Sequence, residues 1–389
     1  MTAATLPSPA VAPPPGNPRF PLFDSLRGIA VLAVLVFHVF LVSGALGRRG
    51  IGDAVTVLGS HGPILFFAIS GFLLYRPWVA ARAAGAPPLE IGRYARRRAL
   101  RILPAYWMAL TVLAIFPGVS GAFGADWWRY YLFLQAYAED TVGRGIPVAW
   151  TLCVEVAFYL ALPLWALAVR HARLRTDLVA LAIVAVAGAA VQLAATREVA
   201  GDLLAQSLVG QSTWFALGMA LAVASVAGRS FGRPGLCWAG AAAAFAGLAV
   251  LRYDTGGLFG IVAALRTPQP VVRTLAELAL TAVLTALLLL PAIAGERGGG
   301  FPRRVLRAAP LAWLGLVSYS VYLWHLTLAE LLAMPAAPQH FDARGLDLAG
   351  RIPEGATPAL LVLTLAASCA VAALSYRWVE LPFLRRKEA

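Results

Sequence analysis

The chain has 389 residues, of which 32 are basic and 19 acidic, so its formal net charge at pH 7 is +13. Hydrophobic residues make up 60% of the chain, charged residues only 13%, and the mean hydropathy is +0.74. A soluble domain of this length needs more charged surface, so the composition argues against that class and predicts an integral membrane protein. The sequence contains no CxxC, HExxH, Walker or GxGxxG pattern, which disfavours metal-binding and nucleotide-binding folds.

About ten apolar stretches are long enough to cross ~30 Å of hydrocarbon as helices. We therefore predict an all-α fold, a polytopic transmembrane helix bundle with about ten spans. Residues 1–19 are expected to be a disordered cytoplasmic lead, 20–384 the transmembrane domain and 385–389 a basic cytoplasmic tail. The predicted spans are 25–46, 55–78, 99–118, 148–169, 177–196, 207–227, 236–252, 272–294, 311–334 and 357–379.

The distribution of charge between these spans predicts the orientation. With the N-terminus in the cytoplasm, most of the 32 basic residues fall in inner loops, and most loop carboxylates fall in outer loops. This is the positive-inside asymmetry of multi-pass proteins. We expect a protein of the inner (plasma) membrane, in contact with the lipid bilayer, with both termini cytoplasmic. The charge of +13 then reflects topology, and no nucleic-acid partner is expected.

The first span carries three titratable residues on one stripe, Asp24, Arg27 and His38. Eleven residues turn an α-helix by about 1100°, which leaves Arg27 and His38 about 20° apart and roughly 16 Å apart along one face. Titratable groups inside a membrane usually line a functional cavity, and imidazole is suited to take a proton near neutrality. His38 is therefore the candidate general base. The alternative is an arginine that reaches the inner surface and a hydrogen-bonded core histidine.

Two further groups lie near the ends of the second and third spans. His61 precedes the apolar run Ile64–Phe72 and is a candidate for lining the same cavity, whereas Ser70 and Gly71 in that run favour close helix packing. Arg98 and Arg101 are spaced i, i+3 at the inner mouth of the third span. They could bind a phosphorylated ligand, or they could serve membrane topology alone.

The fourth and ninth spans carry polar residues at a depth similar to that of His38. Glu155 lies roughly 10 Å below the outer surface, where a carboxylate must be protonated or paired, and His38 is its candidate partner. His325 also reaches the outer third of the membrane, and Tyr319 and Tyr322 share a face with it. For these three residues, structural hydrogen bonding is favoured over a place in the substrate cavity.

Taken in order, these pieces resemble the acyltransferase-3 family of integral membrane acyltransferases. Each piece is short, but the ordered set runs from near residue 20 to residue 383. The matching pieces are Asp24–Arg27 with His38, Phe66–Phe72, Arg97–Tyr106, Trp150–Glu155 with Phe158 and Tyr159, Gly315–His325 and Glu380–Phe383.

The resemblance implies roles for particular residues. The family's arginine and histidine pair falls on Arg27 and His38, its RxxR element on Arg98 and Arg101, and its acidic residue on Glu155. Two positions depart from the family pattern: Thr151 replaces the usual Ser, and Val156 replaces an acidic residue that often follows Glu155.

The resemblance also implies the reaction. An acyl-CoA, with acetyl-CoA expected, would be the donor substrate, and no permanently bound cofactor or metal is expected. His38 would take the proton of an acceptor hydroxyl, Glu155 would orient the imidazole, and the arginines would hold phosphates. An acyl-His38 intermediate stays open.

The acceptor is expected to be a sugar or cell-surface glycan hydroxyl, with a macrolide-type antibiotic as the alternative. A proton-coupled transporter is the alternative of another class. It is disfavoured because no inverted repeats or paired broken helices are evident.

Overall fold

The structure is a computed structural model that describes residues 20–48, 50–197, 201–229, 233–253, 270–294, 300–333 and 353–386. In these ranges every regular element is helical, and nine helices are long and apolar enough to cross a membrane. The bent pair α13 and α14 makes a tenth span if it is counted as one. The prediction of an all-α, polytopic helix bundle is confirmed.

The predicted spans correspond in order to helices of the bundle, although several differ in length. The second is much longer than predicted, because α2 has 33 residues and continues through Pro63 and Pro77. The long helices are α1 (Leu22–Val42), α2 (Ile51–Ala83), α3 (Ile91–Ile115), α5 (Trp150–Ala168), α6 (Leu174–Ala195), α8 (Leu208–Val226), α9 (Pro234–Tyr253), α11 (Val271–Ile293), α14 (Ser318–Ala333) and α15 (Thr357–Ser375). The short ones are α4 (Trp127–Tyr131), α7 (Asp202–Ala205), α12 (Phe301–Leu306), α13 (Ala309–Leu316) and α16 (Leu381–Arg385), with a π-helical turn at Tyr376–Glu380.

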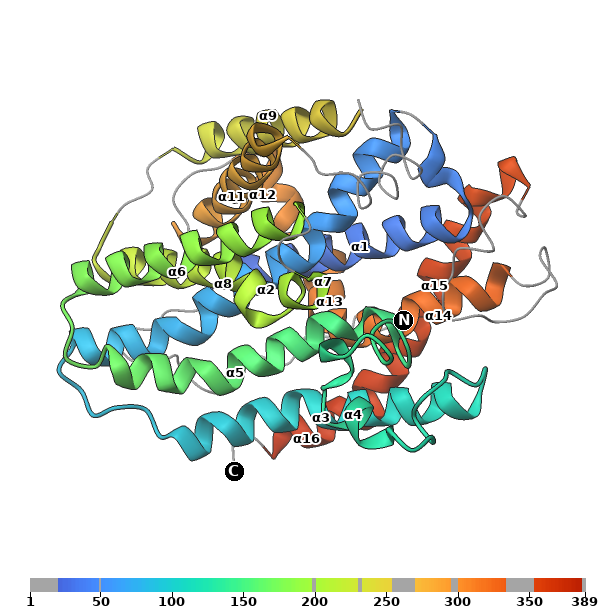
Figure 1. Ribbon diagram of the computed structural model, residues 1–389, viewed down its shortest axis with the longest axis horizontal. Helices are drawn as coiled ribbons and strands as arrows, with labels where there is room; N and C mark the ends of the chain where they lie inside the picture. The colour runs from blue at the N-terminus through green and yellow to red at the C-terminus, as the bar shows by residue number, and fades with distance from the viewer. Residues whose placement is uncertain are drawn as a thin grey trace.

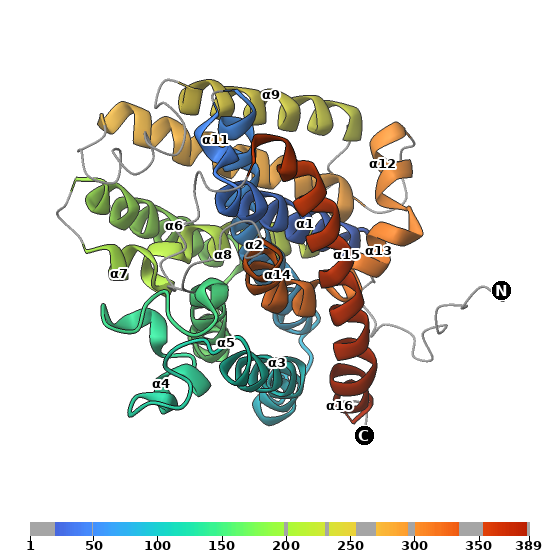
Figure 2. The same ribbon diagram turned by 90° about the vertical axis from the view of Figure 1, so that its right-hand side faces the viewer.

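Helix α1 lies in the middle of the bundle and packs against α2, α13, α14 and α15. Figures 1 and 2 both place α9 along one side of the molecule and α3 with α16 along the opposite side. The buried apolar residues form two large clusters, and α1 contributes to both of them. Leu35 of α1 packs in the cluster with α3 and α14, and Leu26 packs in the cluster with α2, α5 and α8. Both side chains are fully buried, so α1 joins the two halves of the core.

Close backbone contacts bind α1 to α13. A Cβ added to Gly315 would lie 1.7 Å from the carbonyl oxygen of Asp24, and one added to Gly28 would lie 2.6 Å from that of Leu311. A glycine also allows a close backbone contact between α2 and α8, because a Cβ on Gly71 would overlap the carbonyl oxygen of Phe215. Small residues at helix contacts are typical of membrane bundles, and the predicted packing role of Gly71 matches this geometry.

The ninth predicted span, 311–334, is not one continuous helix. Its chain bends by 79° between α13 and α14, so the prediction of an unbroken helix was wrong. The hydroxyl of Ser318 donates a hydrogen bond to the carbonyl of Gly315 at 2.8 Å, and so competes for a carbonyl that a continuous helix would use. Tight packing of Gly315 on α1 fixes α13 independently of α14.

The predicted N-terminal lead, 1–19, and the last three residues, 387–389, lie outside the described residues. Arg385 is the last residue of α16, so the described residues end within the predicted tail. The carbonyl of Arg386 accepts a hydrogen bond from Arg96 of α3 at 3.0 Å.

Candidate active site

A cavity of about 520 Å³ lies among α1, α2, α5, α6, α8, α9, α11 and α14, and we call it the histidine cavity. His38 of α1, His61 of α2 and Tyr322 of α14 line it. His38 lies one turn before the end of α1, where a long apolar run ends and the side chain is half-buried. The cavity therefore brings the predicted base next to a space large enough for a substrate.

His38 of α1 contacts a second histidine, His325 of α14. Nδ1 of His38 lies 3.1 Å from Nε2 of His325, and the two rings meet edge to face. His325 is completely buried on α14, and its own Nδ1 lies 2.8 Å from the carbonyl oxygen of Tyr322 and 3.2 Å from that of Val321.

These contacts define the tautomers of the neutral pair. A carbonyl only accepts, so Nδ1 of His325 must carry the proton, and Nε2 of His325 must be an acceptor. Nδ1 of His38 then carries a proton, which it shares between His325 and the carbonyl of Val34 at 2.9 Å. In the part of the chain that the structure describes, no protein group bonds Nε2 of His38. Nε2 is thus left with a free lone pair, the state that a general base requires.

Glu155 does not pair with His38, which corrects the expected His38–Glu155 contact. Its Oε1 accepts hydrogen bonds from the hydroxyls of Ser70, at 2.6 Å, and Tyr159, at 2.5 Å. Glu155 lines a cavity with Arg27, whereas His38 lines a different one, so the similar depth expected from residue counting does not bring the two side chains together. Ser70 was expected to favour close helix packing, and the structure adds that its hydroxyl donates a hydrogen bond to Glu155.

A second, smaller cavity of about 30 Å³ contains this carboxylate, and we call it the glutamate cavity. Arg27, Glu155 and Tyr319 line it. Pro63 and Tyr322 line both cavities, so the two spaces meet at these side chains. The glutamate cavity, which Arg27 and Glu155 line, is thus a neighbour of the cavity that contains His38.

The three predicted phosphate-binding arginines gather at the same end of the bundle. Arg27 interacts electrostatically with Arg101 and Glu155, and the guanidinium of Arg98 lies 5.9 Å from the ring centre of Tyr159. Among the described residues, Nε of Arg27 and Nε of Arg98 are buried without a hydrogen-bond partner. Buried donors without acceptors are costly in an empty protein and suit a site for an anionic ligand.

Glu380 is a buried carboxylate that the sequence reasoning left without a role. It lies in the π-helical turn, is 2% exposed and accepts a hydrogen bond from the hydroxyl of Ser320 at 2.6 Å. Its charge acts on Arg101 and Arg27, so it helps to balance the arginines. Glu380 belongs to the motif Glu380–Phe383, by which the chain resembles its family, so the sequence already pointed to this residue. Its interaction with Arg101 depends on the π-helical turn that follows α15.

The remaining predicted residues have mixed positions. Asp24 is exposed and lines neither cavity, because its backbone is what packs on Gly315. Tyr319 donates a hydrogen bond to the carbonyl of Ile102 at 2.9 Å, and Tyr322 donates one to that of Val148 at 3.1 Å. Both tyrosines thus have structural bonds, as expected, and both also border the glutamate cavity.

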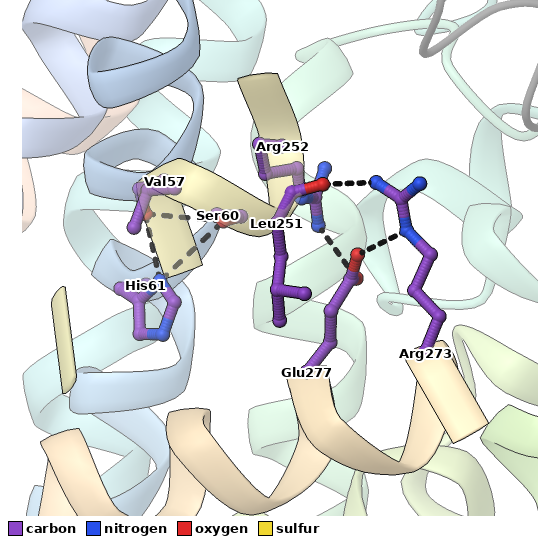
Figure 3. Close-up of polar contacts among 7 residues, drawn as sticks. All are labelled: Val57, Ser60, His61, Leu251, Arg252, Arg273 and Glu277. Atoms are coloured by element: carbon purple, nitrogen blue, oxygen red, sulfur yellow. Dashed lines mark hydrogen bonds and ion pairs between the residues drawn. The ribbon is translucent and has the colours of Figure 1, made fainter. Parts of the chain in front are cut away.

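The wall of the histidine cavity also contains an ion cluster that the sequence reasoning missed. Glu277 of α11 pairs with Arg252 of α9 at 3.4 Å and with Arg273, one turn earlier on α11, at 3.3 Å. Figure 3 shows this cluster and His61, whose Nδ1 lies 2.7 Å from the carbonyl of Val57. The i, i+4 spacing of Arg273 and Glu277 was the available signal.

The family model and two of the relatives that match this chain refer to acyl transfer. A family model described as an acyltransferase domain matches residues 21–377. The chain is 27% identical over 336 residues to the acyltransferase MdmB of Streptomyces mycarofaciens, covering 80% of this chain and 79% of that one. It is also 27% identical to the exopolysaccharide production protein ExoZ of Rhizobium meliloti, covering 85% and 92% of the two chains. The peptidoglycan O-acetyltransferase OatA of Listeria monocytogenes matches at 27% identity, over 37% of this chain and 23% of its own length.

No solved structure matches the chain. The family match spans most of the sequence and includes every helix that contributes to the two cavities. The chain therefore belongs to the acyltransferase-3 family, and the protein is a multi-pass membrane enzyme that transfers acyl groups.

Proposed function

We propose that this enzyme moves an acyl group, with acetyl expected, from acyl-CoA to a hydroxyl of a sugar or cell-surface glycan. The observation that carries the proposal is the free lone pair on Nε2 of His38, which lies beside a cavity of about 520 Å³. A second cavity, which Arg27 lines, adjoins the first. One cavity suits an acceptor, and the other leads toward a cluster of arginines.

The donor would bind through its phosphates at Arg98 and Arg101, with Arg27 deeper in the bundle. Guanidinium groups bind phosphate by charge-assisted, often bidentate hydrogen bonds. Glu155 interacts electrostatically with Arg27, and Glu380 with both Arg27 and Arg101, so the two carboxyl groups limit the repulsion between these arginines. The thioester end would then extend past Glu155 toward Pro63 and Tyr322.

The reaction itself would depend on His38. Nε2 takes the proton of the acceptor hydroxyl while the hydroxyl oxygen attacks the thioester carbonyl. A C–O bond forms, the C–S bond breaks, and the leaving CoA thiolate takes the proton back from His38. His325 acts as a positioning residue, because its Nε2 accepts from Nδ1 of His38 and keeps the lone pair on the reacting nitrogen.

The proposed orientation places the arginine cluster at the cytoplasmic face of the plasma membrane, where acyl-CoA is made. The excess of basic residues in the loops at this end supports it. The histidine cavity would then receive its acceptor from the other side. Because the relatives OatA and ExoZ bear names that refer to peptidoglycan and exopolysaccharide, we place glycans first among acceptors.

A macrolide-type antibiotic is the second candidate acceptor. The histidine cavity is lined by Phe37, Trp150 and Trp214, which also suit an apolar ring system. An assay with both kinds of acceptor separates the two candidates.

The test is transfer from labelled acetyl-CoA by the purified, detergent-solubilised enzyme to a panel of glycans and macrolides. His38→Ala should lower turnover by roughly 10²- to 10⁴-fold, the range of general-base contributions. His171→Ala is the matched control, because His171 is exposed in the loop after α5. Wild-type turnover in a folded His38→Ala variant would remove the proposed base.

A further inference from the structure

Besides His38 and His61, the side chains that line the histidine cavity include two amides and one carboxylate from three helices. They are Gln192 of α6, Gln211 of α8 and Glu277 of α11. None of them belongs to a motif by which the chain resembles its family. Each is held in place by other protein groups, which fixes the atoms that remain available to a ligand.

The two glutamines present their oxygens and not their amino groups. Nε2 of Gln192 donates to the carbonyls of Ala205 at 2.8 Å and Gly210 at 3.1 Å. Nε2 of Gln211 donates to the same carbonyl of Ala205 at 2.9 Å. Both amides are therefore oriented, and within the described residues no donor bonds either side-chain oxygen.

Glu277 is fixed as firmly. Its Oε2 faces Arg252 and its Oε1 faces Arg273, and Arg273 also donates to the carbonyl of Leu251 (Figure 3). The two guanidinium groups compensate the carboxylate charge and prevent its rotation. A carboxylate accepts about four hydrogen bonds, so capacity remains for a ligand after both arginines are bound.

The cavity combines these acceptors with aromatic surface from Trp150 and Trp214. Aromatic faces pack against the C–H faces of a saturated ring, and fixed oxygens accept from the hydroxyls at its edge. A wall that presents acceptors selects ligands that present donors, and it leaves its own groups unpaired when the donor is missing.

We propose that Glu277, Gln192 and Gln211 form an acceptor subsite that binds non-reacting hydroxyl groups of a pyranose ring. The subsite orients the ring, so that one hydroxyl reaches Nε2 of His38. This inference rests on the proposed function, since it assumes that the acceptor occupies the histidine cavity. It adds the residues that recognise the acceptor and the class they select, a ring with several free hydroxyls.

The test uses methyl hexopyranosides and their monodeoxy analogues as acceptors, with labelled acetyl-CoA as donor. Glu277→Gln should raise the KM of the acceptor by roughly tenfold, because a hydrogen bond to a charged carboxylate becomes at best one to a neutral amide oxygen, while the KM of acetyl-CoA stays unchanged. One deoxy analogue should be a poor acceptor for the wild type. That analogue and its parent should differ much less for Glu277→Gln, since the contact is already weakened in the variant.

Asp177→Asn is the matched structural control. Asp177 is a buried carboxylate that also joins helices, through a hydrogen bond from Tyr75 at 2.6 Å and an ion pair with Arg82, and it lines neither cavity. The Asp177→Asn substitution should lower the melting temperature of the protein without changing its discrimination among deoxy sugars. If Glu277→Gln behaves like this control, the cluster only ties α9 to α11 and the subsite is wrong.

The proposed function can be refuted separately from the subsite, because it predicts acyl transfer by the wild type. Absence of transfer to every hydroxyl acceptor by the wild type would refute that function. Transfer by the wild type with unaltered acceptor KM and deoxy-sugar discrimination in Glu277→Gln would refute the subsite alone.

Discussion

Replacement of His325 by leucine tests whether His325 only positions His38 or takes part in proton transfer itself. In the wild type, the Nδ1 proton of His38 has two acceptors, the carbonyl of Val34 at 2.9 Å and Nε2 of His325 at 3.1 Å. His325→Leu removes the second acceptor and leaves the first. The base nitrogen of His38 is preserved, but the ring loses one of the two bonds that fix its tautomer and rotation.

The expected loss follows from this geometry. One neutral hydrogen bond contributes about 1 ± 0.5 kcal/mol, which corresponds to roughly a twofold to tenfold decrease in kcat. Removal of the base itself costs roughly 10²- to 10⁴-fold. His325→Leu should therefore retain far more activity than His38→Ala. His325→Gln should recover part of the loss, because an amide oxygen can accept from Nδ1 of His38.

The assay is kcat for transfer from acetyl-CoA, measured for the single variants and for the double variant with His38→Ala. The double variant should be no worse than His38→Ala alone, because a positioning residue acts only through the base. A loss in His325→Leu as large as that in His38→Ala would show that His325 exchanges the proton itself. Unchanged activity in His325→Leu would refute its positioning role.

Two further predictions concern the donor site and the packing of α1. The double variant Arg98→Gln and Arg101→Gln should bind CoA at least tenfold more weakly and should discriminate less against CoA that lacks its 3′-phosphate, since each phosphate contact is charge-assisted. The control pair Arg93→Gln and Arg97→Gln removes the same charge from exposed positions, and equal affinity loss in the two pairs would reduce the effect to general electrostatics. Gly315→Ala should destabilise the protein by about 1–3 kcal/mol, because its Cβ would overlap a carbonyl of α1, and an unchanged melting temperature would contradict this packing.

The spans could be predicted because hydropathy and length alone decide whether a helix can cross a bilayer. The bend in the ninth span could not. Serine and tyrosine residues follow Val317, but neither residue type breaks a helix by itself, so the local sequence does not mark the bend. It depends on Gly315 meeting the backbone of α1 and on Ser318 using a carbonyl of the previous turn, and both are tertiary features.

The sequence predicted which residues belong to the candidate site better than it predicted which of them contact one another. Counting residues from the end of a span gives an approximate depth, and it grouped His38, Glu155 and His325, of which the structure brings only His38 and His325 into contact. It gives no rotation between different helices, so the partner of His38 could not be chosen between the other two. The glutamate instead faces Ser70, whose small hydroxyl carried no signal of its own.

The missed acceptor wall has a similar cause. Arg273 and Glu277 are one turn apart on a single helix, so their contact can be read from spacing. Arg252 comes from α9, and Gln192 and Gln211 come from α6 and α8, so their convergence requires the whole arrangement of helices. Single polar residues near span ends are common, and only their shared cavity distinguishes these.

The bend before α14 is what allows one helix to serve both cavities. Because α14 starts again at Ser318, its rotation is set independently of α13, which is fixed on α1 through Gly315. Tyr322 and His325 are three residues apart and so share a face of α14. Tyr322 then borders the junction of the two cavities while His325 reaches His38. The junction beside Tyr322 is accordingly where a thioester arriving from the arginines and a hydroxyl arriving in the histidine cavity would meet the base.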